Sequence, residues 1–313
     1  MRLPKVFSAL ACAIALGAVT ASCGGASKAP PRAKPAAWTL GPAMSQRRSY
    51  TASALVGPSV YVAGGMVGDT GRRLRLVQRF DPARGTWTTL SPLPVGVRAG
   101  SAAALGRTIY VVGGTIPSGG GRQVFAYSVD RGTWRRLAPL PAPRDNGAAV
   151  ALGGKIWYLG GLGLEQPKRD VFVYDPARNR WSAGPALPQA LDALGAVVFR
   201  GRIWTVGGID PSGERQRSVW VLDPGARRWR AGPRLPTGIE LAGATVADGR
   251  VQAVWEHTFV VYDPRTGRWS RGPSPQVPRH ALALFAVAGR LWAIGGCTVD
   301  LQDSQVVEER PLS

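Results

Sequence analysis

The sequence predicts an all-β fold of six repeated four-stranded units, and three periodic features indicate it. The first feature is a tryptophan that recurs every 47–49 residues, and after 40 residues at the last interval, at Trp38, Trp87, Trp134, Trp181, Trp229 and Trp269. A proline follows each tryptophan within four or five residues. A repeat of this length cannot bury its apolar face alone, so neighbouring units must stack.

The second feature is a Gly-Gly pair that closes an apolar run, with an aromatic residue three positions before it. These pairs are Gly64-Gly65, Gly113-Gly114, Gly160-Gly161, Gly207-Gly208 and Gly295-Gly296. The third feature is an aspartate at the end of a second apolar run, followed four times by proline. These aspartates are Asp81, Asp130, Asp175, Asp223 and Asp263, and Asp130 lacks the proline. An Asp-Pro step is typical of a turn, because aspartate bonds its own backbone and proline fixes φ.

Each unit therefore contains four short strands, which we name a to d. Strand a is small and apolar, and strand b carries the aromatic residue and ends at Gly-Gly. Strand c ends at the aspartate turn, and strand d begins at the tryptophan. Units of this kind and period are typical of the blades of a β-propeller. The small residues of strand a suit the innermost position, where the blades converge on a central channel.

The order Gly-Gly, then a hydrophobic-Asp step such as Tyr174-Asp175, then tryptophan resembles the kelch motif, and the likeness covers Trp38 to Ser313. The resemblance implies a six-bladed kelch-type β-propeller of four-stranded antiparallel blades, similar to the central domain of the galactose oxidase superfamily. The fifth unit departs from the pattern, because Trp255-Glu256 stands where Gly-Gly is expected. We expect that blade to be present but irregular.

The two ends of the repeat region predict ring closure. Trp38 has no strand c before it, and the last Gly-Gly pair has no tryptophan after it, only the strand candidate 305–310. We therefore expect residues 38–42 to supply strand d of the last blade, which leaves no exposed sheet edge at the seam.

The first 22 residues have the pattern of an export signal: a basic start, a short apolar stretch, then small residues before Cys23. This arrangement resembles the processing site of bacterial lipoproteins, although Thr20 stands where leucine is usual. The prediction is a signal peptide at 1–22, a lipidated Cys23 with a flexible tether at 23–37, and the propeller at 38–313. The alternative is an ordinary secretory peptide cleaved near Ala21. The lipoprotein interpretation places the chain on the outer face of the bacterial cell membrane, or on the periplasmic side of an envelope membrane.

One polar residue stands at the entry to strand a in each unit, 15 or 16 residues before the Gly-Gly position. These residues are Arg48, Arg98, Arg144, Asp192, Glu240 and Arg279. In kelch domains that hold ligands, arginines at this position line the binding face, so we expect the six side chains to ring one channel mouth, with His280 beside them. The alternative is that the arginines hold the framework together and pair with Asp192 and Glu240.

The chain has 39 basic and 19 acidic residues, a formal net charge of +20. A GC-rich coding sequence explains part of this excess, and attraction to anionic surfaces is the functional interpretation. The expected partner is an anionic ligand, a cell-envelope polysaccharide or a protein, and the membrane is engaged through the lipid anchor. We expect a monomer and no nucleic-acid partner.

The sequence favours a non-catalytic cell-surface binding module over an enzyme. Two histidines and one cysteine of the folded region make no metal-ligand pattern, so we expect no metal and no cofactor, and a copper oxidase is disfavoured. The alternative is a sugar-acid mutarotase or epimerase, as found among exported kelch propellers. In that case Glu240 or Asp192 is the acid/base, beside Arg279 and His280.

Overall fold

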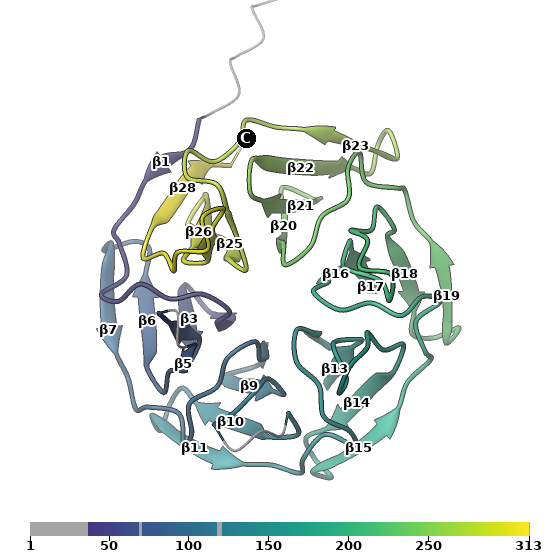
Figure 1. Cartoon of the computed structure of the whole chain (residues 1–313), viewed down its shortest axis with the longest axis horizontal. Coiled ribbons are helices and arrows are strands. Elements are labelled where there is room, and N and C mark those ends of the chain that lie inside the picture. Colours follow the sequence, from purple (N-terminus) through teal and green to yellow (C-terminus); the bar gives the residue numbers. More distant parts are fainter. Residues whose placement is uncertain (1–36, 69–70, 118–120, 313) are drawn as a thin grey trace, which may run out of the picture. The chain divides into compact units, whose positions relative to one another are not determined.

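The computed structural model describes residues 37–68, 71–117 and 121–312, which belong to one compact unit. Within those residues six antiparallel four-stranded sheets follow one another around a ring (Figure 1). The predicted signal segment and most of the predicted tether lie outside the described residues. The six-bladed, all-β prediction is thus confirmed.

Each blade uses its strands in chain order from the channel outward. Blade 1 contains β2 (Ala52–Val56), β3 (Ser59–Ala63), β6 (Val77–Asp81) and β7 (Thr86–Thr89). Blade 2 contains β8 (Ser101–Leu105), β9 (Thr108–Val112), β10 (Val124–Ser128) and β11 (Thr133–Arg136). Blade 3 contains β12 (Ala148–Leu152), β13 (Lys155–Leu159), β14 (Val171–Asp175) and β15 (Arg180–Ala183).

Blades 4 to 6 repeat this order, except that the outermost strand of blade 6 comes from the start of the described chain. They are β16 (Gly195–Phe199), β17 (Arg202–Val206), β18 (Trp220–Asp223) and β19 (Arg228–Ala231); β20 (Gly243–Ala247), β21 (Arg250–Trp255), β22 (Thr258–Asp263) and β23 (Arg268–Arg271); and β25 (Ala283–Val287), β26 (Arg290–Ile294), β28 (Val307–Pro311) and β1 (Thr39–Leu40). Two short two-stranded sheets lie outside the blades: β4 (Met66–Val67) pairs with β5 (Arg72–Arg73), and β24 (Arg279–His280) pairs with β27 (Cys297–Thr298).

The seam closes as predicted. β1 pairs antiparallel with β28, with Thr39 opposite Glu309 and Leu40 opposite Glu308. Trp38, only 2% exposed, packs edge-on against Phe259 of blade 5. The first described strand thus completes the last blade and covers its edge, which would otherwise be free to pair with other chains.

The hydrophobic core lies between the blades, at the six places where neighbouring sheets face each other. Between blades 2 and 3, for example, Tyr110 and Val112 pack with Tyr158 and Tyr174. Equivalent clusters join the other neighbours. Because each apolar sheet face is buried only by the next blade, the ring must be complete to be stable.

The repeat tryptophans form hydrogen bonds between neighbouring units on the outer side of the ring. Each indole N–H donates to the backbone carbonyl four residues after the tryptophan of the preceding unit, at 2.8–2.9 Å. Trp87, for instance, bonds Pro42, and Trp38 closes the circle on Pro273. The constant spacing of tryptophan in the sequence therefore follows from a contact made between units.

The Gly-Gly pairs also form hydrogen bonds between neighbouring blades. The amide of the second glycine donates to a backbone carbonyl in the segment that leads into the next blade, as from Gly65 to Val97 and from Gly296 to Arg48. Both glycines have positive φ, and a Cβ on Gly64 would lie 2.4 Å from the Val97 carbonyl oxygen. Any side chain at this point would force the blades apart, which explains why glycine recurs there.

Blade 5 is complete but irregular, as expected. Without Gly-Gly, β21 and β22 run on and meet in a tight turn at Glu256, with Trp255 opposite Thr258. The Glu256 amide still donates to the Arg279 carbonyl, so the contact with blade 6 is kept. Blade 5 therefore has no long loop between strands b and c on the channel-entry face.

Candidate functional site

On the channel-entry face, one residue in each blade, just before strand a, has the left-handed backbone conformation. These residues are Tyr50, Ala99, Asn146, Ala193, Leu241 and Ala281, with φ between 45° and 54°. From Ala99 to Ala281, each amide donates to the carbonyl of the equivalent residue on the preceding blade, at 2.7–2.9 Å. These bonds fix the height at which each strand a starts, and so fix the geometry of the channel entry.

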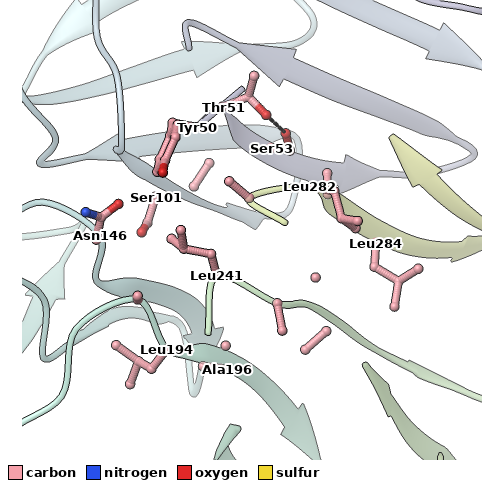
Figure 2. A pocket seen from close by; sticks show the side chains of 18 of the residues that line it. Tyr50, Thr51, Ser53, Ser101, Asn146, Leu194, Ala196, Leu241, Leu282 and Leu284 are labelled. Atoms are coloured by element: carbon pink, nitrogen blue, oxygen red, sulfur yellow. Dashed lines mark hydrogen bonds between the residues drawn. The ribbon is translucent and has the colours of Figure 1, made fainter. Parts of the chain in front are cut away.

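A central pocket of about 260 Å³ is lined by all six of these left-handed residues. Its wall is made by the left-handed residues and by the small side chains of the six strands a, as predicted for the innermost position. Figure 2 shows Tyr50, Asn146 and Leu241 grouped around the opening, with the Thr51 and Ser53 hydroxyls 3.1 Å apart beside them. The pocket has room for part of a ligand or for one extended side chain.

The residue directly before each left-handed position forms what we call the mouth ring. Its members are Ser49, Arg98, Asp145, Asp192, Glu240 and His280. Five of them pair with the residue that follows Gly-Gly in the same blade, as Arg98 does with Thr115 and Asp192 with Ile209. The mouth ring therefore has a fixed backbone position in the blade edge.

Three consecutive blades contribute carboxylates to the mouth ring: Asp145, Asp192 and Glu240. Asp192 is only 8% exposed, and burial, followed by the charges of Asp145 and Glu240, raises its pKa to about 6. Burial also raises the pKa of Asp145, while Arg98 acts in the opposite direction. None of the ion pairs among the described residues includes Asp145 or Asp192. Such groups are characteristic of binding sites.

The other charged members of the mouth ring have partners. Glu240 accepts a hydrogen bond from Arg215 Nε at 2.8 Å, and the Arg215 guanidinium lies over the Trp255 ring. His280 Nδ1 lies 3.7 Å from Glu256 Oε1, and burial lowers the pKa of His280. A neutral His280 at pH 7 can donate and accept hydrogen bonds without adding charge.

Members of the mouth ring influence Tyr50 of the pocket wall, although they come from different blades. Burial is the main cause that raises the pKa of Tyr50, and the negative charge of Glu240 adds to it across the intervening blade 6. Arg98 acts on the same phenol with the opposite sign. Tyr50, at the pocket entrance, therefore lies in the combined field of Arg98, Glu240 and Asp303.

Two of the arginines expected at the mouth are inside the blades instead. Arg48 is fully buried, donates to the carbonyls of Gly64, Leu76 and Val62 and to Gln78 Oε1, and burial lowers its pKa to about 10. Arg279 is also fully buried, and it pairs with Glu308 at 2.7 Å. The expectation that Arg48 and Arg279 line the mouth is corrected by this burial: they hold strands b and c together.

Arg144 also belongs to the framework by its contacts. It is 6% exposed, lies over the Phe172 ring and pairs with Asp170. Of the six positions predicted at the channel mouth, the structure therefore places Arg98, Asp192 and Glu240 in the mouth ring, together with His280. The framework partners are Gln78, Asp170 and Glu308 rather than Asp192 and Glu240.

The error was one of register. Counting back from Gly-Gly gives 16 residues to Arg48, Arg144 and Arg279, and 15 to Arg98 and Asp192. A one-residue difference in extended chain turns the side chain to the opposite side. Counting from the start of the small apolar strand would have selected Asp145, which the sequence reasoning missed.

A second group of arginines, at the entry to strand c, is also structural. Arg75, Arg122, Arg169 and Arg217 each donate Nε to a leucine carbonyl in the segment after strand d, at 2.6–2.8 Å. Part of the basic excess is therefore used for internal hydrogen bonds. Across residues 37–68, 71–117 and 121–312, no three His, Cys, Asp or Glu side chains are grouped as a metal site.

Comparison with known proteins agrees with this architecture. The model of the KLHDC2/KLHL20/DRC7 Kelch-repeats domain matches residues 49–238, more than half of the chain. The chain belongs to the kelch-repeat family. Mouse (Mus musculus) Kelch-like protein 35 is 40% identical over 55 residues, which are 18% of this chain and 9% of that protein. The chain thus spans a small part of the length of this relative.

A solved structure titled "Structure of YjhT" superposes with a TM-score of 0.75 over 86% of this chain and 96% of that one. At 15% sequence identity this likeness shows the fold alone. In the described part of the chain no helix is long and apolar enough to cross a membrane.

Proposed function

We propose that this kelch propeller is a non-catalytic binding module that holds a partner at the mouth ring, outside the cytoplasm and tethered through Cys23. The observation that carries the binding site is Asp192: a nearly buried carboxylate with no ion pair among the described residues, flanked by Asp145 and Glu240. An ionised acid in this position costs stability, and such costs are characteristic of functional sites.

The charge of the mouth ring indicates the chemistry of the partner. The mouth ring has one arginine and three carboxylates, and one of these carboxylates, Glu240, is already paired with Arg215. Asp145 and Asp192 therefore leave the ring with an excess of negative charge when His280 is neutral. A lysine or arginine side chain of a partner would neutralise Asp192 at the mouth ring, directly before Ala193 and Leu194 of the pocket wall. We therefore propose a basic peptide segment, whereas the arginine count suggested an anionic ligand at this mouth.

The enzyme alternative gains no support from the geometry. It needed Arg279 as an anion clamp beside Glu240 or Asp192, and the Arg279 guanidinium is fully buried against Glu308. No other observation in the described residues favours sugar-acid chemistry. The binding proposal is therefore the only one developed.

An array of short peptides that vary in lysine, arginine, aspartate and glutamate content tests the proposal. The wild-type chain should retain lysine- or arginine-containing peptides at pH 7.5 and lose them below pH 6, because Asp192 becomes protonated as pH falls through about 6. Asp192→Asn should weaken retention about tenfold, which corresponds to about 1.4 kcal/mol.

The matched control is Asp130→Asn, which removes an exposed carboxylate paired with Arg107 at the end of strand c. This variant has the same change of net charge and should retain the peptides as the wild type does. Equal losses in both variants would show a general charge effect. Selective retention of acidic peptides would contradict the proposal and would indicate that Arg98 is the binding group.

A further inference from the structure

The outermost strands of four consecutive blades present arginine to solvent. β11, β15, β19 and β23 follow one another around the ring (Figure 1), and all of their residues except the tryptophans are exposed. They carry seven arginines and no acidic residue. We call this set the arginine wall: Arg135, Arg136, Arg180, Arg228, Arg230, Arg268 and Arg271.

In the described part of the chain, the arginine wall has no ion-pair partner within hydrogen-bond reach, although Arg180, Arg228 and Arg268 lie opposite the turn aspartates of strand c in the strand register. None of its seven members takes part in an ion pair among the described residues. Other exposed arginines do have partners: Arg84 pairs with Asp81, Arg107 with Asp130 and Arg178 with Asp175. The wall is thus a band of like charges whose mutual repulsion a bound polyanion would relieve.

Composition alone does not explain this band. The equivalent strands of blades 1 and 6, β7 and β1, have the sequences Thr-Trp-Thr-Thr and Thr-Leu, with no charged residue. A uniform excess of arginine would be spread over all six blades. The arginines instead occupy one continuous arc of the circumference, which is the arrangement of an interaction surface.

The shape of the arc decides the kind of partner. The strands lie on the outer side of the ring (Figure 1), so the wall is convex and a flat surface such as a bilayer could touch only part of it. A flexible linear polyanion can follow four blades in succession. Double-stranded DNA is too stiff for this path, because bending it sharply costs several kcal/mol.

We propose that the arginine wall binds an acidic polysaccharide, a flexible chain with a carboxylate on successive sugar units. Guanidinium groups bind carboxylates with two parallel hydrogen bonds, and regular repetition on both partners allows many weak contacts to add up. In β15, β19 and β23 a half-buried tryptophan directly follows an exposed arginine and can offer apolar surface to a sugar ring. The choice of a glycan over single-stranded nucleic acid rests on the proposed export.

Affinity electrophoresis in gels that contain polygalacturonate tests the proposal. The full-length Cys23→Ala chain is used throughout, so that no lipid anchor contributes. It should be retarded by polygalacturonate and not by neutral pullulan, and the retardation should weaken as salt screens the charges. The wall variant Arg180→Gln/Arg228→Gln/Arg268→Gln should lose at least about tenfold in affinity.

The matched control is Arg84→Gln/Arg107→Gln/Arg178→Gln, which removes the same charge from exposed arginines outside the wall. It should bind like the parent chain. Equal loss in both triple variants, no retardation of the parent, or tighter binding to a single-stranded oligothymidylate or to anionic vesicles would each overturn the proposal. Asp192→Asn should leave polygalacturonate binding unchanged, which separates this site from the mouth ring.

Discussion

At the scale of single residues, adjacent positions in this propeller have opposite roles. Arg144 turns into blade 3 against Phe172, while Asp145, the next residue, joins the mouth ring. Arg279 and His280 show the same division, with the arginine fully buried and the histidine partly exposed. The buried arginines donate hydrogen bonds to backbone carbonyl groups and so hold the blade edges rigid. This rigidity positions the polar residues next to them.

The ionisation of Asp192 should make stability depend on pH. Its pKa is near 3.8 when unfolded and about 6 when folded, so the folded state binds the proton more tightly between these values. Stability therefore falls as pH rises from about 4 to 6, and the penalty is complete above pH 6. After solvent screening we expect about 1 kcal/mol, so Asp192→Asn should raise Tm by about 3 °C at pH 7.5.

Thermal melts at pH 7.5 and pH 4 check this prediction, since the difference between wild type and Asp192→Asn should vanish at the lower pH. Asp130→Asn is the control, because that carboxylate is exposed and paired. A stabilisation by Asp192→Asn that is the same at both pH values would mean that packing, not ionisation, is responsible.

At the scale of elements, the ring depends on contacts between blades rather than within them. The indole bonds outside, the Gly-Gly amides near the centre and the apolar clusters between sheets all join neighbours. The short segment of Trp38 and β1 contributes strongly to ring closure for its length. Trp38 packs between blades 5 and 6, and Thr39 pairs with β28 of blade 6. Losing this segment opens the seam of the ring.

Deletion of residues 24–44 should therefore destabilise the protein much more than deletion of 24–37. Removing a buried tryptophan side chain typically costs about 3–5 kcal/mol, and the exposed edge of β28 adds to this. For a domain of this size we expect Tm to fall by about 10 °C, measured by circular dichroism. The shorter deletion, which keeps Trp38, is the control; equal Tm values would show that β1 does not hold the seam.

At the scale of the whole molecule, charge is divided between surfaces. The mouth ring is acidic and the arginine wall is basic. Several other arginines form hydrogen bonds inside the blades. A net charge of +20 therefore says little about any one site. An acidic polymer at the wall and a basic segment at the channel can be held at the same time, since the wall lies on the outermost strands of blades 2 to 5 and the mouth ring lies before the innermost strands.

Attachment to a membrane is a prediction at this scale, and it rests on Cys23, which lies outside the described residues. If Cys23 is lipidated, the protein expressed in bacteria should partition into the detergent phase of a Triton X-114 extract. Cys23→Ala should move it to the aqueous phase or leave it unprocessed. A soluble wild-type product beginning at Ser22 would contradict the lipoprotein prediction.

The architecture of this protein can be predicted from its amino-acid sequence. Trp38 and its five repeats, the Gly-Gly pairs and the aspartate turns gave the number of blades, the order of strands and the closing strand. These features recur because each makes the same contact with the next unit, so local patterns suffice to reveal them. Glycine is required where a Cβ would meet the neighbouring backbone, and that need is visible in the sequence.

Which polar residues lie in the mouth ring depends on contacts between blades. Arg48 and Arg98 look equivalent in the sequence, but one residue of register places the first in the blade interior and the second in the mouth ring. The left-handed turn at Tyr50 and its equivalents sets this register, and residues as different as tyrosine, alanine and leucine adopt it. The conformation comes from bonds to the preceding blade rather than from local sequence, so the charge of the mouth could not be predicted from the chain alone.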